Sequence, residues 1–535
     1  MVERRLSGLP ASPGMAFGPA AIFRAIGEAT RAKGPVASER QTLADAVAAA
    51  LEAVTALAGS LEGEAADIVG FQIALLDDDA LTESAYAAIE RGEPAETAWR
   101  QAMAEEIGGY ENSDDPYFRA RSADLADIRD RVLRHILGLP ELTQAKTGSV
   151  IVGEDLSPSA FLGIDWSQGG GIVLGAGSPS SHVAMLARGR GVPMVVGIGP
   201  DWRSVFGVIV VDGAAGTVLT GPSPDSVAKA RSQAGALGAA RARAEARMGE
   251  PALTRDGTPV AVMINVAGMA DVAGFPVAAC DGIGLTRTEF LVEQALRDEA
   301  LQYELYAQLL GWAAGRPVTI RTLDAGGDKP IPGYTIAGES NPFLGLRGIR
   351  LSLRHPDVFR IQLRALARAA ALGRLKIMLP MVTAPHELEQ TRALLEDVVG
   401  ELLTEGGACA LPALGIMVEV PAAAMAVDAF DAAFFSIGSN DLTQYATAAS
   451  RDGSEVAPYA DVLHPGVLAM IARVAAHGAA SGREVSLCGD AGGDPRLIAA
   501  LLRAGLRTLS VSPGLLAVTK AAIREVELAA PGPAA

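Results

Sequence analysis

The sequence predicts a multidomain α/β plus all-α protein, in which a small α/β domain carries a helical-bundle insertion and precedes a C-terminal TIM (β/α)8 barrel. The first observation is length, because 535 residues, 49% of them hydrophobic, exceed one ordinary core. The second is that helical periodicity fills residues 25–145 and gives way to short strand patterns in 146–222. The third is that strand and helix patterns alternate eight times within residues 251–535.

The small α/β domain is expected to be discontinuous, formed by residues 1–24 together with 146–222. Residues 6–22 mix strand and turn signals. Candidate strands of the second segment lie at 150–152, 172–174, 192–196, 208–212 and 217–219. Because the opening segment is expected to join this sheet, the helical residues between the two segments are an insertion.

The insertion, residues 25–145, has apolar residues three and four positions apart, which is typical of a helical bundle. The expected helices lie at 39–61, 65–76, 80–91, 94–107 and 116–137. This region holds 23 acidic and 10 basic residues, so it carries most of the chain's net charge of −17. The acidic face is either a solvated surface or a docking surface for a basic partner, where charge would set the rate and register of association.

A linker helix is predicted over residues 223–250, with its helical pattern at 226–248. It is rich in alanine and arginine, and some flexibility is expected at Gly235 and Gly238.

The barrel, residues 251–535, is predicted from its alternation of buried strands and amphipathic helices. The candidate strands are 260–265, 282–287, 318–324, 376–381, 415–420, 433–439, 485–489 and 508–512. Helices are expected between them, among others at 298–312, 356–371, 384–403, 421–430 and 465–477.

His182 is the candidate phosphoryl acceptor of the small domain. It follows an apolar strand and a turn, where Ser180 and Ser181 can cap a helix that begins near His182. A helix N-terminus disfavours a charged imidazole and stabilises a dianion attached to it. The local pattern alone favours a histidine that only satisfies a turn, so the hypothesis depends on the barrel.

Polar residues gather where the barrel strands end, which is the active-site face of a TIM barrel. The set comprises Asn265, Arg287, Arg321, Arg347, Glu419, Asn440, Asp441, Arg451 and Cys488. Arginine offers bidentate donors to phosphate and carboxylate oxygens. Glu419 and Asp441 suit Mg²⁺, which takes few carboxylates and keeps positions for substrate oxygens. Cys488 is either a proton donor in a dry pocket or a small buried core residue.

Composition excludes several other classes of function. The net charge of −17 argues against nucleic-acid binding. No apolar run is long enough to span a membrane, and the first residues lack a hydrophobic signal segment. Three widely spaced cysteines, Cys280, Cys409 and Cys488, fit a reduced cytoplasm better than a disulfide framework.

With these residues in view, the chain resembles enzyme I of the bacterial sugar phosphotransferase system, the phosphoenolpyruvate–protein phosphotransferase. The matching motifs run in order along nearly the whole chain, at residues 11–14, 180–182, 285–291, 320–329, 341–347, 417–421, 435–445 and 487–494. The resemblance implies a swivelling phosphohistidine domain, a helical domain that binds the carrier protein HPr, and a barrel that binds phosphoenolpyruvate (PEP).

The resemblance also implies roles for individual residues. His182 would accept the phosphoryl group of PEP and pass it to a histidine of HPr, which energises sugar uptake. Glu419 and Asp441 would bind Mg²⁺, and Cys488 would protonate the enolate to give pyruvate. The residues that would hold PEP are Arg287, Arg321, Arg347, Asn440 and Arg451. The family further implies a cytoplasmic homodimer that associates through its barrel.

Two departures from the family pattern and two alternative functions stay open at this point. The family usually has threonine at the position of Ser180 and glutamate at that of Asp490. One alternative is a regulatory phosphorelay enzyme that serves a non-sugar carrier. The other is a relative of pyruvate phosphate dikinase or PEP synthase, although only the helical region precedes His182 and it lacks a glycine-rich nucleotide loop.

Overall fold

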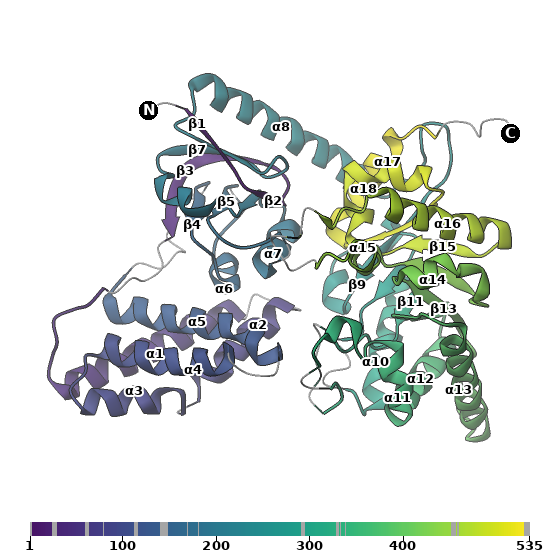
Figure 1. The fold of residues 1–535 in the computed structure, drawn as a ribbon, viewed down its shortest axis with the longest axis horizontal. Coiled ribbons are helices and arrows are strands. Elements are labelled where there is room, and N and C mark those ends of the chain that lie inside the picture. Colours follow the sequence, from purple (N-terminus) through teal and green to yellow (C-terminus); the bar gives the residue numbers. More distant parts are fainter. Residues whose placement is uncertain are drawn as a thin grey trace. The chain divides into compact units, whose positions relative to one another are not determined.

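A computed structural model describes residues 3–23, 29–58, 64–78, 80–111, 116–139, 148–167, 169–179, 181–289, 295–327, 331, 333–336, 339–450, 456 and 459–528. The chain forms two compact units, residues 1–239 and 240–535, and each is described by itself (Figure 1). The finer division into four parts, with a bundle at 25–145 and a linker at 223–250, stays a prediction.

The first unit contains an eight-stranded mixed sheet in the order β1-β8-β7-β3-β4-β5-β6-β2. Its strands are β1 (Arg4–Ser7), β2 (Leu9–Ser12), β3 (Met15–Phe23), β4 (Val150–Gly153), β5 (Gly171–Leu174), β6 (Met194–Val196), β7 (Val208–Asp212) and β8 (Thr217–Thr220). Strand β3 pairs in parallel with β4 and antiparallel with β7. The chain before the helical bundle and the chain after it therefore share one sheet.

Two short helices accompany this sheet, α6 (Pro158–Leu162) and α7 (His182–Arg190), together with the 3-10 turn η2 (Gly199–Ser204). Helix α7 follows β5 and precedes β6, so the crossover between these parallel neighbours carries His182 at its helix start. A left-handed Gly191 (φ 67°) ends α7 and turns the chain back toward the sheet.

The helical bundle consists of α1 (Val36–Ala58), α2 (Glu64–Leu76), α3 (Ala80–Glu90), α4 (Ala95–Glu111) and α5 (Pro116–Leu137) (Figure 1). All five expected helices are present. Their apolar faces meet around Trp99, which is fully buried and whose indole nitrogen donates to the Arg129 carbonyl oxygen at 3.1 Å. Asp127 of α5 accepts from Gln72 at 2.8 Å and from Ser157, the N-cap of α6, at 2.7 Å. This carboxylate joins the bundle to the α/β sheet region.

Helix α8 (Pro224–Ala246) passes through Gly235 and Gly238 without a break. Nearly all of its side chains between Ala230 and Ala244 are solvent-exposed. Beyond the helix, the buried Lys520 ammonium donates to the carbonyl oxygens of Met248, Glu250 and Ala279 at 2.9, 3.1 and 2.6 Å. These bonds fix the segment after α8 to the barrel.

The second unit is a closed barrel of eight parallel strands, as the sequence predicted. The strands are β9 (Ala261–Val266), β10 (Ile283–Thr286), β11 (Val318–Arg321), β12 (Leu375–Leu379), β13 (Ala413–Val418), β14 (Phe434–Ile437), β15 (Glu484–Leu487) and β16 (Thr508–Val511). One expected boundary was wrong, because β11 ends at Arg321 rather than at Asp324. The backbone N–H groups of Leu323 and Asp324 bond to side chains of Gln362 and Glu289 instead of to a neighbouring strand.

Helices cover the outside of the barrel (Figure 1). They are α10 (Glu299–Ala313), α11 (Ile349–Arg354), α12 (Pro356–Ala370), α13 (Pro385–Thr404), α14 (Pro421–Met425), α15 (Ser439–Thr447), α16 (Pro465–Ser481), α17 (Pro495–Arg503) and α18 (Leu516–Glu525). The expected helix at 421–430 is shorter, since α14 gives way to a 3-10 turn, Val427–Ala429. Among the described residues, no helix combines the length and apolar character that a membrane span requires.

Candidate active site

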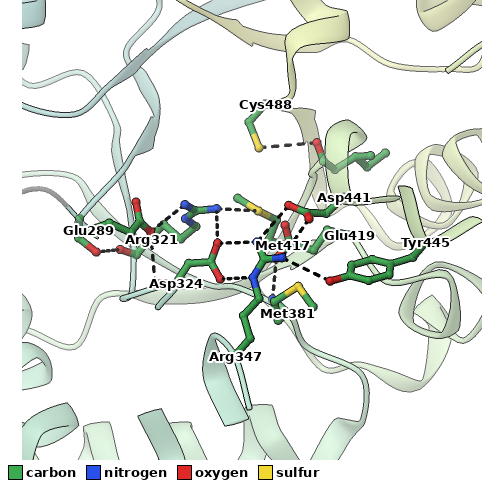
Figure 2. Close-up of polar contacts among 12 residues, drawn as sticks. Glu289, Arg321, Asp324, Arg347, Met381, Met417, Glu419, Asp441, Tyr445 and Cys488 are labelled. Atoms are coloured by element: carbon green, nitrogen blue, oxygen red, sulfur yellow. Dashed lines mark hydrogen bonds and ion pairs between the residues drawn. The ribbon is translucent and has the colours of Figure 1, made fainter. Parts of the chain in front are cut away.

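A buried polar cluster lies at the carboxyl ends of the barrel strands (Figure 2). Arg321 is the last residue of β11, Glu419 follows β13, Asp441 lies in the first turn of α15 after β14, and Cys488 follows β15. Arg347 reaches the same cluster from the loop before α11. Figure 2 shows these five predicted residues converging, which is the outcome expected when parallel strands end at one barrel face.

Arg321 is held by two carboxylates that the sequence analysis did not assign to the site. Its guanidinium lies 2.8 Å from Glu289 and 3.3 Å from Asp324, and it is 5% exposed. Both acids stand close to a predicted arginine, at Arg287-x-Glu289 and Arg321-x-x-Asp324, and that spacing was the available signal. Their carboxylates fix the guanidinium in place before any ligand arrives.

Arg347 joins two carboxylates that come from different strand ends. Its guanidinium contacts both oxygens of Asp324 at 3.2 Å and those of Asp441 at 3.2 and 3.3 Å. Burial works to lower its pKa, but the two carboxylates outweigh burial and raise the pKa. The Tyr445 hydroxyl accepts from Arg347 at 3.3 Å while it donates to the Phe343 carbonyl oxygen at 2.6 Å. Arg347 therefore has its donors saturated by protein groups.

The backbone next to Arg347 requires a glycine. Gly348 has φ 59°, and a Cβ there would lie 2.9 Å from the Cβ of Met381. Met381 is itself in the left-handed region (φ 56°), and its N–H donates to Glu419 at 2.6 Å. Local backbone geometry thus brings the Arg347 loop and the loop after β12 against the Glu419 carboxylate.

The surroundings of Glu419 disfavour its ionised form. It is 1% exposed, and burial together with the Asp441 and Asp324 carboxylates raises its pKa to about 8. The Arg321 and Arg347 guanidiniums oppose this effect without cancelling it. Four buried carboxylates, these three and Glu289, therefore share two guanidinium charges, and one further cation would relieve their repulsion.

The donor set fits Mg²⁺. Within the part of the chain that the structure describes, no group of three or more His, Cys, Asp or Glu residues is arranged to hold a metal alone. Mg²⁺ commonly uses only one or two carboxylates and completes its shell with water and substrate oxygens. The electrostatic repulsion between Glu419 and Asp441, seen in the raised pKa of Glu419, is what such a cation would remove.

Cys488 is a buried thiol that stays protonated at neutral pH. Burial raises its pKa to about 11, although a hydrogen bond with Ser436 and the charges of Arg321 and Arg287 pull in the opposite direction. It packs in a hydrophobic cluster with Leu285, Met378, Met417 and Phe434, and its Sγ donates to the Ile437 carbonyl oxygen at 3.6 Å. A neutral thiol in a dry pocket can give a proton to carbon but is a poor nucleophile.

The backbone around Cys488 is fixed from two sides. The Asn265 amide donates to the Cys488 carbonyl oxygen at 2.9 Å. The next residue, Gly489, packs so closely that a Cβ there would lie 1.9 Å from the Ser439 hydroxyl oxygen. The predicted strand-end residue Asn265 therefore orients the thiol loop rather than facing a ligand.

The rim of the site is more exposed than its centre. The Asn440 amide donates to the Asp490 carboxylate and accepts from the Asp490 N–H, both at 3.0 Å. Asp490 thus reaches Asn440 despite being one methylene shorter than the glutamate of the family pattern. Arg287 is exposed, and its backbone N–H bonds to Val266 at 2.8 Å. Arg451 lies outside the described residues.

In the first unit, His182 begins α7 directly after its N-cap, Ser181. The Ser181 hydroxyl accepts from the Ala184 N–H at 3.3 Å, so the predicted cap at Ser181 is confirmed. Ser180 and the His182 side chain lie outside what the structure describes.

Comparison with known protein families agrees with this arrangement. Three models of PEP-utilising enzymes match the chain in order: the N-terminal region at residues 7–121, the mobile domain at 145–216 and the PEP-binding domain at 241–528. This chain belongs to the enzyme I family of PEP-utilising enzymes.

Relatives of this enzyme I family member match it over most of its length. A phosphoenolpyruvate-protein phosphotransferase of Haloferax volcanii is 39% identical over 87% of this chain and 83% of its own. One of Geobacillus stearothermophilus is 35% identical over 98% of this chain and 93% of its own. A multiphosphoryl transfer protein of Rhodobacter capsulatus is 37% identical over 85% of this chain but only 55% of its own.

The pKa of Glu419 makes a prediction about stability and pH. Because its pKa is raised from 4.5 to about 8, the folded chain holds this proton more tightly than the unfolded chain does. Its stabilising contribution is fully present below pH 4.5 and is lost as the pH rises through 8. In metal-free protein, we expect Glu419→Gln to reduce the loss of stability between pH 5 and 8, by at most about 1.4 kcal/mol per pH unit. Denaturant unfolding at several pH values measures this slope.

The matched control is Glu389→Gln, which removes a carboxylate from an exposed position of α13. It should leave the slope unchanged. Equal slopes for wild type and Glu419→Gln would show that Glu419 is already ionised in the folded protein at pH 5.

Proposed function

We propose that this chain is a phosphoenolpyruvate–protein phosphotransferase, which moves the phosphoryl group of PEP to its own His182 and then to a histidine of the carrier HPr. The observation that carries the proposal is the buried cluster of arginines and carboxylates at the barrel mouth, in a chain whose three regions match PEP-utilising enzymes. The relatives' names favour this function over the dikinase alternative.

The proposed PEP site combines fixed and adaptable cations. Arg321 and Arg347 are locked by carboxylates, so their charge is oriented before substrate binds and needs little reorganisation. Arg287 is exposed at the rim and is free to approach the carboxylate or phosphate of PEP. Asn440 and Arg451 complete the proposed set, with Asn440 oriented by Asp490.

Glu419 and Asp441 are proposed to hold Mg²⁺ beside these arginines. When bound, the ion would neutralise negative charge on the substrate oxygens, which is the largest contribution in phosphoryl transfer. The buried carboxylates would in turn lose their mutual repulsion.

The proposed reaction balances with this chain's own groups. A neutral ring nitrogen of His182 attacks phosphorus in line with the bridging oxygen, the P–O bond breaks, and its electron pair stays on the enolate of pyruvate. The Cys488 thiol then gives its proton to the terminal carbon of the enolate, and the resulting thiolate is reprotonated by water. The apolar surroundings of Cys488 favour this order, because they keep the thiol neutral until the enolate forms.

The second transfer requires a carrier, and the acidic bundle supports the HPr proposal. Residues 25–145 hold 23 acidic and 10 basic residues, a balance that would attract a basic docking face. His182 has to meet the barrel mouth in one step and the carrier in the next, so the linker at 223–250 is proposed to permit a domain swing.

Association as a homodimer through the barrel, and a cytoplasmic location consistent with three free cysteines, belong to the same proposal.

The first prediction of this function concerns the acceptor. His182→Ala should abolish incorporation of label from PEP radiolabelled in its phosphoryl group, because the proposed mechanism uses the His182 ring as its acceptor. His386→Ala, which changes an exposed histidine of α13, should label like wild type. Label that persists at full level in His182→Ala would assign the acceptor elsewhere.

A second prediction concerns the metal. Protein freed of divalent ions with EDTA should lose self-phosphorylation by PEP, and added Mg²⁺ should restore it, because the proposed ion would neutralise charge on the substrate oxygens. Labelling rates before and after Mg²⁺ addition measure the effect. Full-rate labelling of the EDTA-treated protein would show that this pair is not a metal site.

A third prediction concerns proton donation. Cys488→Ala should slow pyruvate formation by about 10²–10⁴-fold, the usual contribution of a positioned acid, and should weaken PEP binding far less. Single-turnover pyruvate release and PEP binding separate the two effects. Cys280→Ala removes another buried thiol as the control, and turnover unchanged in Cys488→Ala would remove Cys488 from the mechanism.

A further inference from the structure

Behind the active site, three buried side chains form a continuous hydrogen-bonded relay between two loops of the barrel. The Leu323 N–H donates to the Gln362 carbonyl oxygen at 3.1 Å, and the Gln362 amide donates to the Tyr306 hydroxyl at 3.2 Å. The Tyr306 hydroxyl donates to the Gln302 carbonyl oxygen at 3.3 Å, and the Gln302 amide donates to the Ala295 carbonyl oxygen at 2.9 Å. None of the three side chains is more than 3% exposed.

The direction of the relay is set by its ends. A backbone N–H such as that of Leu323 can only donate, and a carbonyl oxygen such as that of Ala295 can only accept. These ends fix which atom of each glutamine amide is the oxygen and which is the nitrogen. The Tyr306 hydroxyl must then donate to Gln302. Burial raises the pKa of Tyr306, so this hydroxyl keeps its proton at neutral pH. Head-to-tail bonds of this kind strengthen one another in a low-dielectric interior.

One end of the relay lies directly beside the active-site charges. Leu323 directly precedes Asp324, the carboxylate that contacts both Arg321 and Arg347 (Figure 2). The Asp324 N–H donates to Glu289 at 3.2 Å, and Glu289 also contacts Arg321. Two side chains thus hold this backbone: Gln362 accepts from the N–H of Leu323, and Glu289 accepts from the N–H of Asp324.

The other end reaches the segment that follows β10, since Ala295 lies between Glu289 and α10. The relay therefore ties the backbone at Ala295, which comes shortly before α10, to the backbone at Leu323, directly before Asp324, through helices α10 and α12. Gln302 and Tyr306 are one turn apart on α10, and Gln362 lies on the facing side of α12. A core that only needed to fill this space would use apolar side chains, which carry no risk of unpaired polar atoms.

We infer that Gln302, Tyr306 and Gln362 are positioning residues for PEP, which set the place of the Asp324 carboxylate and, through it, the Arg321 and Arg347 guanidiniums. The inference rests on the proposed function, because it assigns these arginines to the substrate. None of the three residues touches substrate. They act by fixing the backbone next to Asp324, whose carboxylate contacts both guanidiniums.

The test uses full-length protein with Tyr306→Phe, which removes one hydroxyl from the middle of the relay, and Gln362→Met, which removes both bonds of Gln362. The KM for PEP in self-phosphorylation should rise about 3- to 30-fold in each variant, and kcat should change less than the KM, because the displaced arginines bind substrate throughout the reaction. The double variant should resemble the single ones, since one break already disconnects the loops.

The control is Phe359→Leu, at a buried position of α12 next to the relay. It should lower the melting temperature as much as the relay variants do while leaving the KM unchanged. Relay variants that lose thermal stability but keep the wild-type KM would overturn the inference, because the relay would then serve stability alone.

Hydrogen exchange at the Leu323 amide separates failure of this inference from failure of the proposed function. Exchange should become at least about tenfold faster in Gln362→Met, because the amide loses its buried acceptor. Unchanged exchange would overturn the relay whatever the activity. A wild-type protein that PEP does not phosphorylate would overturn the proposed function, and with it the assignment of these residues to PEP.

Discussion

The Asp324 carboxylate is the contact on which the active site depends. It is fully buried and lies 3.3 Å from Arg321 and 3.2 Å from Arg347, so it determines where both guanidiniums stand. Buried ions are tolerated only when they are paired, and removal of one partner of such a pair usually costs about 3–5 kcal/mol. Each of Asp324, Arg321 and Arg347 therefore needs the others as charge partners. Asp441, which follows β14, pairs with Arg347 and so connects it to a second strand end on the same face. The catalytic face is one ionic network rather than a set of independent side chains.

The same network explains why the supporting groups are polar. Glu289 binds Arg321 and the Asp324 N–H together, and Gln362 takes the neighbouring N–H of Leu323. These two bonds replace strand pairing, which is why β11 ends at Arg321. The strand stops early because its next residues are needed as a rigid loop, and precise placement of charge is what phosphoryl transfer requires of a protein.

The sequence was sufficient to predict the repeated strands and helices of the barrel, and the site residues that lie at the ends of its strands. Eight strands were predictable from alternation, and Arg321, Glu419, Asp441 and Cys488 from their position at strand ends. Glu289 and Asp324 were not assigned although each stands close to a predicted arginine, because the sequence does not show that Glu289 contacts Arg321 or that Asp324 also contacts Arg347. Tyr306 and Gln362 gave no signal, since a tyrosine or glutamine on a helix is compatible with many roles. Contacts between side chains far apart in sequence have no local pattern.

Dryness of the barrel mouth has two opposite consequences, and both serve the proposed reaction. Burial keeps the Cys488 thiol neutral, with a pKa of about 11, which preserves the proton it would donate. Burial also raises the pKa of Glu419 to about 8, so that a cation bound there would displace a proton. A wetter site would lower both pKa values. Cation binding at Glu419 would then depend less on release of a proton from its carboxyl group. Arg287 and the Asn440–Asp490 pair, at the rim, are more exposed than this centre.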